Sequence, residues 1–173
     1  MKKIAIVFLI LVIGVLVFSL NRKNVPKQEN KRGDQTVPIA SNDGFLGEKG
    51  KTVENEGDKI LIDENEVNDE NLHAFNYYST KAGKTLYFFI IKASDGTYRA
   101  AANACEVCFG VKKGFTQVGD LIKCENCGTT YAKDQIAVIK GGCNPRPISR
   151  NVPVVNSRLA IDLTDIESIA GLF

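Results

Sequence analysis

Residues 85–108 read TLYFFIIKA-SDG-TYRAAANA-CEVC, and this stretch decides the fold. Thr85–Ala93 is almost entirely apolar and rich in aromatic and branched residues, as expected for a strand that is buried on both faces. Asp95-Gly96 supplies the positive φ that a tight hairpin turn requires. Thr97–Ala104 then predicts a partner strand. The hairpin therefore leads directly into a pair of cysteines.

Short strand-like runs separated by turn residues surround this hairpin. The predicted strands are Lys59–Asp63, Leu72–Ser79, Leu121–Lys123, Gln135–Lys140 and Arg158–Leu163. Thr164-x-x-Glu167 has the pattern of a capping box and predicts a short last helix. Strands do not alternate with helices, which disfavours a doubly wound parallel sheet. We predict one mainly β domain over residues 58–173.

Two pairs of cysteines share the same internal spacing, C-x2-C-x15-C-x2-C, and Gly128 follows the second pair. A tight turn can direct two thiolates to one point while its backbone N–H groups donate to the sulfurs. Two such turns supply enough thiolates for a tetrahedral zinc ion, a mononuclear iron or a [2Fe–2S] cluster. The predicted ligands of a metal or cofactor are Cys105, Cys108, Cys124 and Cys127.

The fifth cysteine, Cys143, lies in the segment Gly141-Gly142-Cys143-Asn144-Pro145. Its two glycines are expected to let the backbone approach another group closely. We expect Cys143 to lie near the centre without binding the metal, and the alternatives are a further ligand, a redox partner or a spare thiol. Disulfide formation or thiol–disulfide exchange within the pairs is an alternative to metal binding. An exchanger usually places its pair at the start of a helix after a strand, and that context is missing here.

Composition excludes several other kinds of site. The chain has a single histidine, His73, so it cannot form a two-histidine zinc protease site or a two-histidine iron–sulfur site. We expect His73 to be structural or on the surface. The net charge of +2 gives no reason to propose nucleic-acid binding. No set of nucleophile and base is apparent, so an electron carrier is expected rather than an enzyme that transforms a substrate.

Residues 4–20, IAIVFLILVIGVLVFSL, carry no charge and are flanked by Lys2 and Lys3 before them and Arg22 and Lys23 after them. A helix of this length spans roughly 25 Å, the short end of what crosses a bilayer. We predict a single transmembrane anchor after a cytoplasmic tail of residues 1–3, with a cleaved signal peptide as the alternative. Residues 21–57 are polar and predict a flexible linker. The β domain is expected outside the cytoplasm.

Thr85–Lys133 resembles the core of a Rieske-type domain. The shared order is strand, hairpin turn, strand, first ligand pair, loop, short strand and second ligand pair, followed by Gly128 and Tyr131. Each Rieske loop supplies one cysteine and one histidine, whereas both loops here supply cysteines. Because imidazole ligands raise the potential of a cluster, the resemblance implies a lower potential here.

The chain also resembles the FtrD-like family of membrane iron–sulfur proteins, over about Ile60 to Leu163. The stretches that carry the resemblance are Phe88–Lys92 with Ser94–Gly96, Arg99–Ala101, Ala104–Cys108, Gly114-Phe115, Gly119-Asp120, Cys124–Gly128 and Gly141–Pro145. This resemblance implies a membrane-attached iron–sulfur protein, in some members associated with a ferrous-iron permease. Many members carry several transmembrane helices, whereas one is predicted here, so a separate membrane permease or redox partner is expected.

The leading hypothesis is therefore a small Rieske-like or zinc-ribbon-like β domain on a membrane anchor. Its centre would be an iron–sulfur cluster or a mononuclear iron that serves in electron transfer or iron handling. Two alternatives remain. One is a zinc-ribbon interaction module, in which zinc only stabilises the fold. The other is a C-x-x-C thiol–disulfide oxidoreductase.

Overall fold

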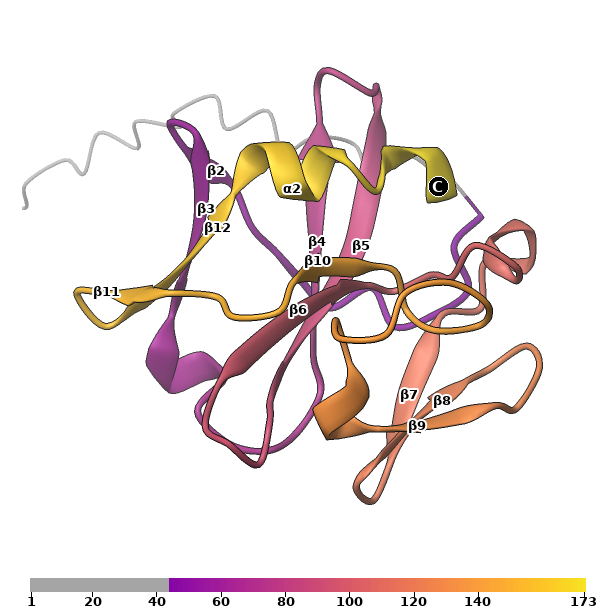
Figure 1. Cartoon of the computed structure of the whole chain (residues 1–173). Coiled ribbons are helices and arrows are strands. Elements are labelled where there is room, and N and C mark those ends of the chain that lie inside the picture. The colour runs from indigo at the N-terminus through magenta and orange to yellow at the C-terminus, as the bar shows by residue number, and fades with distance from the viewer. Residues whose placement is uncertain (1–43) are drawn as a thin grey trace, which may run out of the picture. The chain divides into compact units, whose positions relative to one another are not determined.

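The computed structural model describes residues 44–173, which form three small β-sheets with little helix (Figure 1). The strands are β1 (Lys51–Thr52), β2 (Asn55–Glu56), β3 (Lys59–Asp63), β4 (His73–Ser79), β5 (Lys84–Lys92), β6 (Tyr98–Ala102), β7 (Phe115–Val118), β8 (Leu121–Cys124), β9 (Thr130–Ala132), β10 (Pro147–Ser149), β11 (Val154–Val155) and β12 (Arg158–Asp162). The helical pieces are α2 (Leu163–Glu167) and the 3-10 turns η2 (Glu64–Glu66), η3 (Phe109–Val111), η4 (Lys133–Gln135) and η5 (Ala170–Leu172).

The largest sheet has the order β1-β4-β5-β6-β10. Its middle is the predicted hairpin: β5 pairs antiparallel with β6, and Phe89 lies opposite Ala101. Every residue from Thr85 to Ile91 is buried, as expected for a strand that is covered on both faces. The alanines of β6 are fully buried as well, and their small side chains let other elements pack closely over this strand.

Side chains of β5 point alternately into two separate hydrophobic cores, because successive residues of a strand face opposite sides of its sheet. Phe88 and Ile90 belong to a core formed with β3, β12 and α2. Phe89 and Ile91 belong to a smaller core that contains Phe115, Ile122, Ile136 and two of the cysteines. The central strand therefore supports the fold with one face and the cysteine region with the other.

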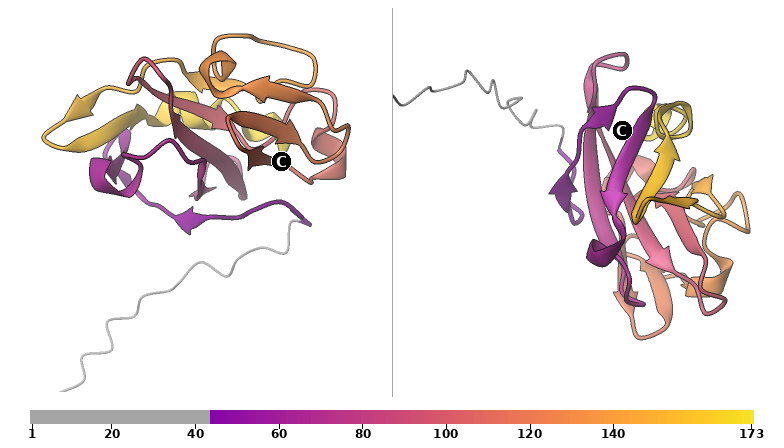
Figure 2. Two further views of the ribbon diagram at one scale, coloured as in Figure 1. Left: turned by 90° about the horizontal axis from the view of Figure 1, so that it is seen from below. Right: turned by 90° about the vertical axis from the view of Figure 1, so that its left-hand side faces the viewer.

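The two smaller sheets lie on either side of the central sheet (Figures 1 and 2). One has the order β11-β12-β3-β2 and joins an early strand to a late one, with Ile62 opposite Leu159. The other has the order β7-β8-β9 and carries the second cysteine pair at the end of β8. Phe115 and Ile122 attach this three-stranded sheet to the face of β5 that bears Phe89.

The prediction of a strand over Gln135–Lys140 is wrong. The segment follows η4 as a series of turns, and Ala137 has a φ of 58°. The reason is the buried side chain of Arg99, whose guanidinium donates to the backbone oxygens of Asp134 and Ile136. These carbonyl groups therefore need no neighbouring strand. The apolar pattern correctly indicated burial of Ile136 and Ala137, but burial does not by itself determine a β conformation.

The short last helix is present, but its predicted capping box is wrong. Helix α2 begins at Leu163, its N-cap is Asp162, and no side chain makes a capping hydrogen bond. The backbone N–H of Leu163 instead donates to the carbonyl oxygen of Asp58 at 2.8 Å. The capping pattern therefore marked the helix but placed its start too late.

The predicted linker, residues 21–57, overlaps the described part of the chain from residue 44. Phe45 is buried and its ring stacks on Tyr87 at a centroid distance of 4.0 Å. β1 then pairs in parallel with β4. Residues 44–57 thus contact the domain, although their composition is polar. The predicted anchor at residues 4–20 lies outside the described residues, and among residues 44–173 there is no helix long and apolar enough to cross a bilayer.

Candidate metal centre

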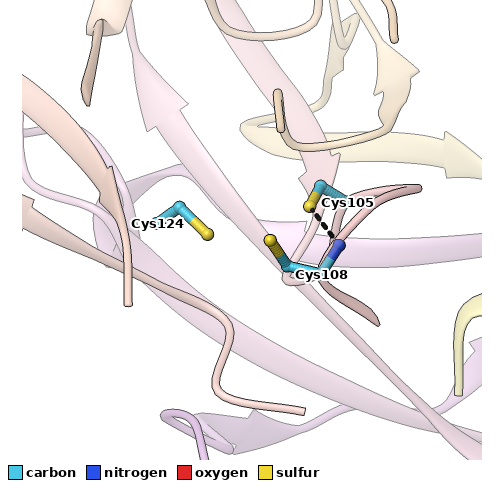
Figure 3. Close-up of side chains that lie close together, drawn as sticks. All are labelled: Cys105, Cys108 and Cys124. Carbon is cyan, nitrogen blue, oxygen red and sulfur yellow. Dashed lines mark hydrogen bonds between the residues drawn. The ribbon is translucent and has the colours of Figure 1, made fainter. Parts of the chain in front are cut away.

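The first cysteine pair follows the end of β6 without a long connection. Cys105 is buried, with 1% of its surface exposed, and belongs to the core beneath Phe89. The backbone N–H of Cys108 donates to Sγ of Cys105 at 3.1 Å, and the N–H of Phe109 donates to the carbonyl oxygen of Cys105 at 3.1 Å. This tight turn directs both sulfurs toward the same side (Figure 3). The turn continues into η3 and ends at Lys112, which has a left-handed φ of 56°.

The second pair surrounds the turn between β8 and β9. Cys124 is the last residue of β8 and is buried, whereas Cys127 is exposed. The N–H of Gly128 donates to the carbonyl oxygen of Cys124 at 2.9 Å. Gly128 has a φ of 76°, which L side chains rarely adopt, so the predicted need for glycine after the second cysteine is explained by the turn.

Asn103, two residues before the first cysteine, is hydrogen-bonded to the start of β7, and no sequence pattern singled it out. Its side chain is fully buried, accepts from the N–H of Phe115 at 2.7 Å, and donates to the carbonyl oxygen of Glu48 at 3.1 Å. A Cβ on Gly114 would lie 2.6 Å from Oδ1 of Asn103, so glycine is needed there. The available signal was a single amide within the run of alanines that precedes Cys105.

A third loop brings Cys143 to the same place. Sγ of Cys143 lies 4.0 Å from Sγ of Cys108. Gly141 and Gly142 have φ values of 93° and 61°. The expected close backbone approach is wrong, because a Cβ at either glycine would have no atom within 4 Å. These glycines instead supply the left-handed backbone that turns the loop.

The five sulfurs form two groups that share one member. Cys105, Cys108 and Cys124 make an inner group, and Cys108, Cys127 and Cys143 make an outer group; within each, all sulfurs lie within 4.8 Å of one another. In Figure 3 the sulfurs of Cys108 and Cys124 point toward each other. All five cysteines are free thiols. The structure thus brings together every cysteine that the sequence singled out.

Hydrogen bonds and burial give these thiols different proton affinities. Hydrogen bonding of its sulfur with the hydroxyl and the backbone N–H of Thr129 lowers the pKa of Cys127 to about 6. Burial raises the pKa of Cys124 to about 11 and also raises the pKa of Cys105. The hydrogen bond between Cys143 and Cys127 raises the pKa of Cys143 to about 12. A metal that binds the buried thiols must therefore displace protons from them.

Two ion pairs involve residues next to the cysteine pairs. Lys123 Nζ lies 3.2 Å from Glu125 Oε1, and Arg146 Nη1 lies 3.7 Å from Glu106 Oε1. His73 lies at the start of β4, where Nε2 is 2.6 Å from Oδ1 of Asp69, and it belongs to neither sulfur group. Within residues 44–173, sulfur is the donor at the candidate centre.

The inner group also lines a small open pocket. Cys105, Cys108 and Cys124 form part of its lining, which also includes Phe45, Phe109 and Phe173. Cys105 and Cys124 are each only 1% exposed, and such shielded sulfurs suit a soft metal or a cluster held by thiolates. The donor set therefore fits an iron–sulfur centre.

The fold and the site define a mainly β domain with a cysteine cluster that can hold a metal. A model of the family "Membrane iron-sulfur containing protein FtrD-like" matches residues 67–173, more than half of the chain and all five cysteines. The chain therefore belongs to the FtrD-like family, as the sequence resemblance indicated. Searches of curated proteins and of solved structures found no match.

Proposed function

We propose that this chain is a membrane-anchored iron–sulfur protein, or a mononuclear iron protein, that serves in electron transfer or iron handling. The observation that carries the proposal is the convergence of free thiols from three loops on one edge of the β core. Membership of a family named for membrane iron–sulfur proteins supports it. The apolar residues 4–20 supply the proposed anchor, with the domain outside the cytoplasm.

Different residues of the chain would bind the group, position the cysteine turns and adjust the properties of the centre. Cys105, Cys108, Cys124 and Cys127 would hold the group, and the core that contains Phe89 would keep the two cysteine turns in register. Backbone N–H groups such as that of Cys108 would tune the group by donating to sulfur. An iron–sulfur cluster supplies one-electron chemistry when it is bound. Exposure of Cys127 gives a membrane permease or redox partner access to the edge of the centre.

The test is anaerobic purification of the full chain in detergent, followed by elemental analysis, visible absorption and electron paramagnetic resonance. We expect iron, a red-brown colour that bleaches on reduction, and a paramagnetic signal in one redox state. A colourless protein with bound zinc, even after reconstitution with ferrous iron and sulfide, would contradict the proposal and favour the zinc-ribbon alternative. A metal-free protein that reduces insulin disulfides would favour the oxidoreductase.

The anchor is tested separately by fractionating cells that produce the full chain or a form lacking residues 4–20. We expect the full chain to sediment with membranes and to resist extraction by alkaline carbonate, and the shortened form to lose this association. Recovery of the full chain in the soluble fraction would contradict a membrane anchor.

A further inference from the structure

We propose that Cys143 is itself a ligand of the centre, so that the site is built from five thiolates in an inner and an outer group that share Cys108. This inference rests on the proposed metal-binding function and changes its ligand set. The two C-x-x-C pairs alone predict a single group of four sulfurs. The structure instead places the sulfur of Cys127 in one group with those of Cys108 and Cys143.

The separation of the sulfurs of Cys108 and Cys143 suits a shared metal. Two thiolates bound to one tetrahedral ion at about 2.3 Å lie about 3.8 Å apart. The sulfurs of Cys108 and Cys143 are 4.0 Å apart. Because a disulfide bond is only about 2.05 Å long, this spacing corresponds to the edge of a coordination tetrahedron and not to a sulfur–sulfur bond.

The loop that carries Cys143 is attached to the same strand that positions the first pair. The N–H of Arg146 donates to the carbonyl oxygen of Ala104 at 3.1 Å, and the N–H of Ala102 donates to the carbonyl oxygen of Arg146 at 2.8 Å. Ala104 immediately precedes Cys105. The backbone therefore fixes the distance between Cys143 and the first cysteine turn.

The start of the same loop is closed by a local turn. The side-chain amide of Asn144 donates to the carbonyl oxygen of Gly141 at 3.2 Å, and the left-handed φ values of Gly141 and Gly142 reverse the chain. Cys143 is thus held between a turn before it and two strand-type hydrogen bonds after it. A cysteine with no role at the centre would need neither the turn nor these hydrogen bonds to fix its position.

The inner and outer groups of sulfurs differ in how deeply their cysteines are buried. Cys105 and Cys124 are buried, Cys108 and Cys143 are partly buried, and Cys127 is exposed. Inner ligands thus belong to the core, whereas the outer ligands Cys127 and Cys143 lie toward the surface. If Cys143 completes the outer group, the exposed ligand Cys127 is accompanied by the partly buried ligand Cys143. Loss of either cysteine should then open the same side of the centre.

The first test needs no variant. The reduced, metal-free full chain in detergent is loaded with Co²⁺, treated with iodoacetamide, and analysed by mass spectrometry for the modification of each cysteine. We expect Co²⁺ to slow the labelling of all five cysteines, Cys143 included, by at least tenfold. If Cys143 is labelled equally fast with and without Co²⁺ while the other four are protected, its ligand role is overturned and metal binding stands. If no cysteine is protected, both proposals are overturned.

The second test compares Cys143→Ala with Cys127→Ala and with Ile139→Ser, a control that changes an exposed side chain of the same loop. Each variant is titrated with Co²⁺ and followed by the sulfur-to-metal charge-transfer absorption. We expect both cysteine variants to lose intensity to a similar degree and to bind Co²⁺ at least tenfold more weakly, with the control unchanged. A Cys143→Ala spectrum and affinity equal to those of the wild type would overturn the inference.

Discussion

At the scale of single residues, Thr129 lowers the pKa of the Cys127 thiol. In the reduced, metal-free protein we expect iodoacetamide to modify Cys127 fastest, with a rate that rises with pH around a midpoint near 6, because hydrogen bonding between its sulfur and Thr129 lowers the pKa of this thiol. Thr129→Val removes the hydroxyl and should move the midpoint up toward about 8.5, the value of a free cysteine. The rate at each cysteine is measured by mass spectrometry across a pH series.

Thr130 provides the matched control for this experiment, since it is the next residue and its side chain is also exposed. Thr130→Val should leave the pH midpoint of Cys127 near 6. An unchanged midpoint in Thr129→Val would show that the hydroxyl does not set the acidity of this thiol.

Asn103 connects the chain just before the first cysteine pair to Phe115 of β7 and to Glu48. Asn103→Ala leaves the buried N–H of Phe115 and the carbonyl oxygen of Glu48 without their partner. Each loss costs about 1–3 kcal/mol, so the free energy of unfolding should fall by about 2–6 kcal/mol. Urea denaturation of the detergent-solubilised chain measures the change. Asn151→Ala, at an exposed position, should change it by less than about 0.5 kcal/mol.

At the scale of elements, the two faces of β5 have different tasks. Phe89 lies against Phe115 at a centroid distance of 6.3 Å in the core of the cysteine region, whereas Phe88 lies against Phe75 at 5.6 Å in the other core. Phe88→Leu and Phe89→Leu should each destabilise the fold by about 1–2 kcal/mol. We expect Phe89→Leu alone to weaken Co²⁺ binding, by several-fold. Equal Co²⁺ affinities in the two variants would mean that both cores support the centre alike.

Much of this architecture could be predicted from the sequence where one strong local pattern dominates. The run Thr85–Ala93, its Asp95-Gly96 turn and the return strand gave the centre of the sheet because apolar residues on both faces require burial on both sides. The segment Gln135–Lys140 failed because its conformation depends on Arg99, which is distant in sequence. The pattern of residues within the segment cannot reveal a contact with a side chain that is distant in sequence.

The sequence could predict that cysteines are the ligands of the candidate site. It could not predict which of the five sulfurs lie together in each group. Repeated C-x-x-C spacing indicates that each pair can turn toward one point, and the structure brings the pairs together. The approach of Cys143 to Cys108 depends on backbone bonds between Arg146 and β6, which no local pattern encodes. The burial of Asn103 likewise depends on Glu48 and Phe115, which come from opposite directions along the chain.

At the scale of the whole molecule, metal binding should stabilise one part of the domain more than the rest. The sheet β7-β8-β9 and the loops that carry the cysteines share a small core, whereas β3, β12 and α2 pack in a larger one. Removing the metal with a chelator should therefore raise amide hydrogen exchange in residues 105–143 by at least tenfold, with little change in β3 and β12. Mass spectrometry of the loaded and chelated protein measures the pattern. A uniform increase across the domain would contradict it.

The pairing of β3 with β12 has a consequence for how the protein is made. A ribosome releases Ile60 and Ile62 first, and the partners Leu159 and Ile161 emerge only after the whole intervening chain from β4 to β11 has been made. Until then β3 can pair only with the short strand β2, and contacts between residues so far apart in sequence as those of β3 and β12 form slowly. A nascent chain that stalls before β12 would expose this apolar strand, which makes truncated products prone to aggregate and dependent on chaperones.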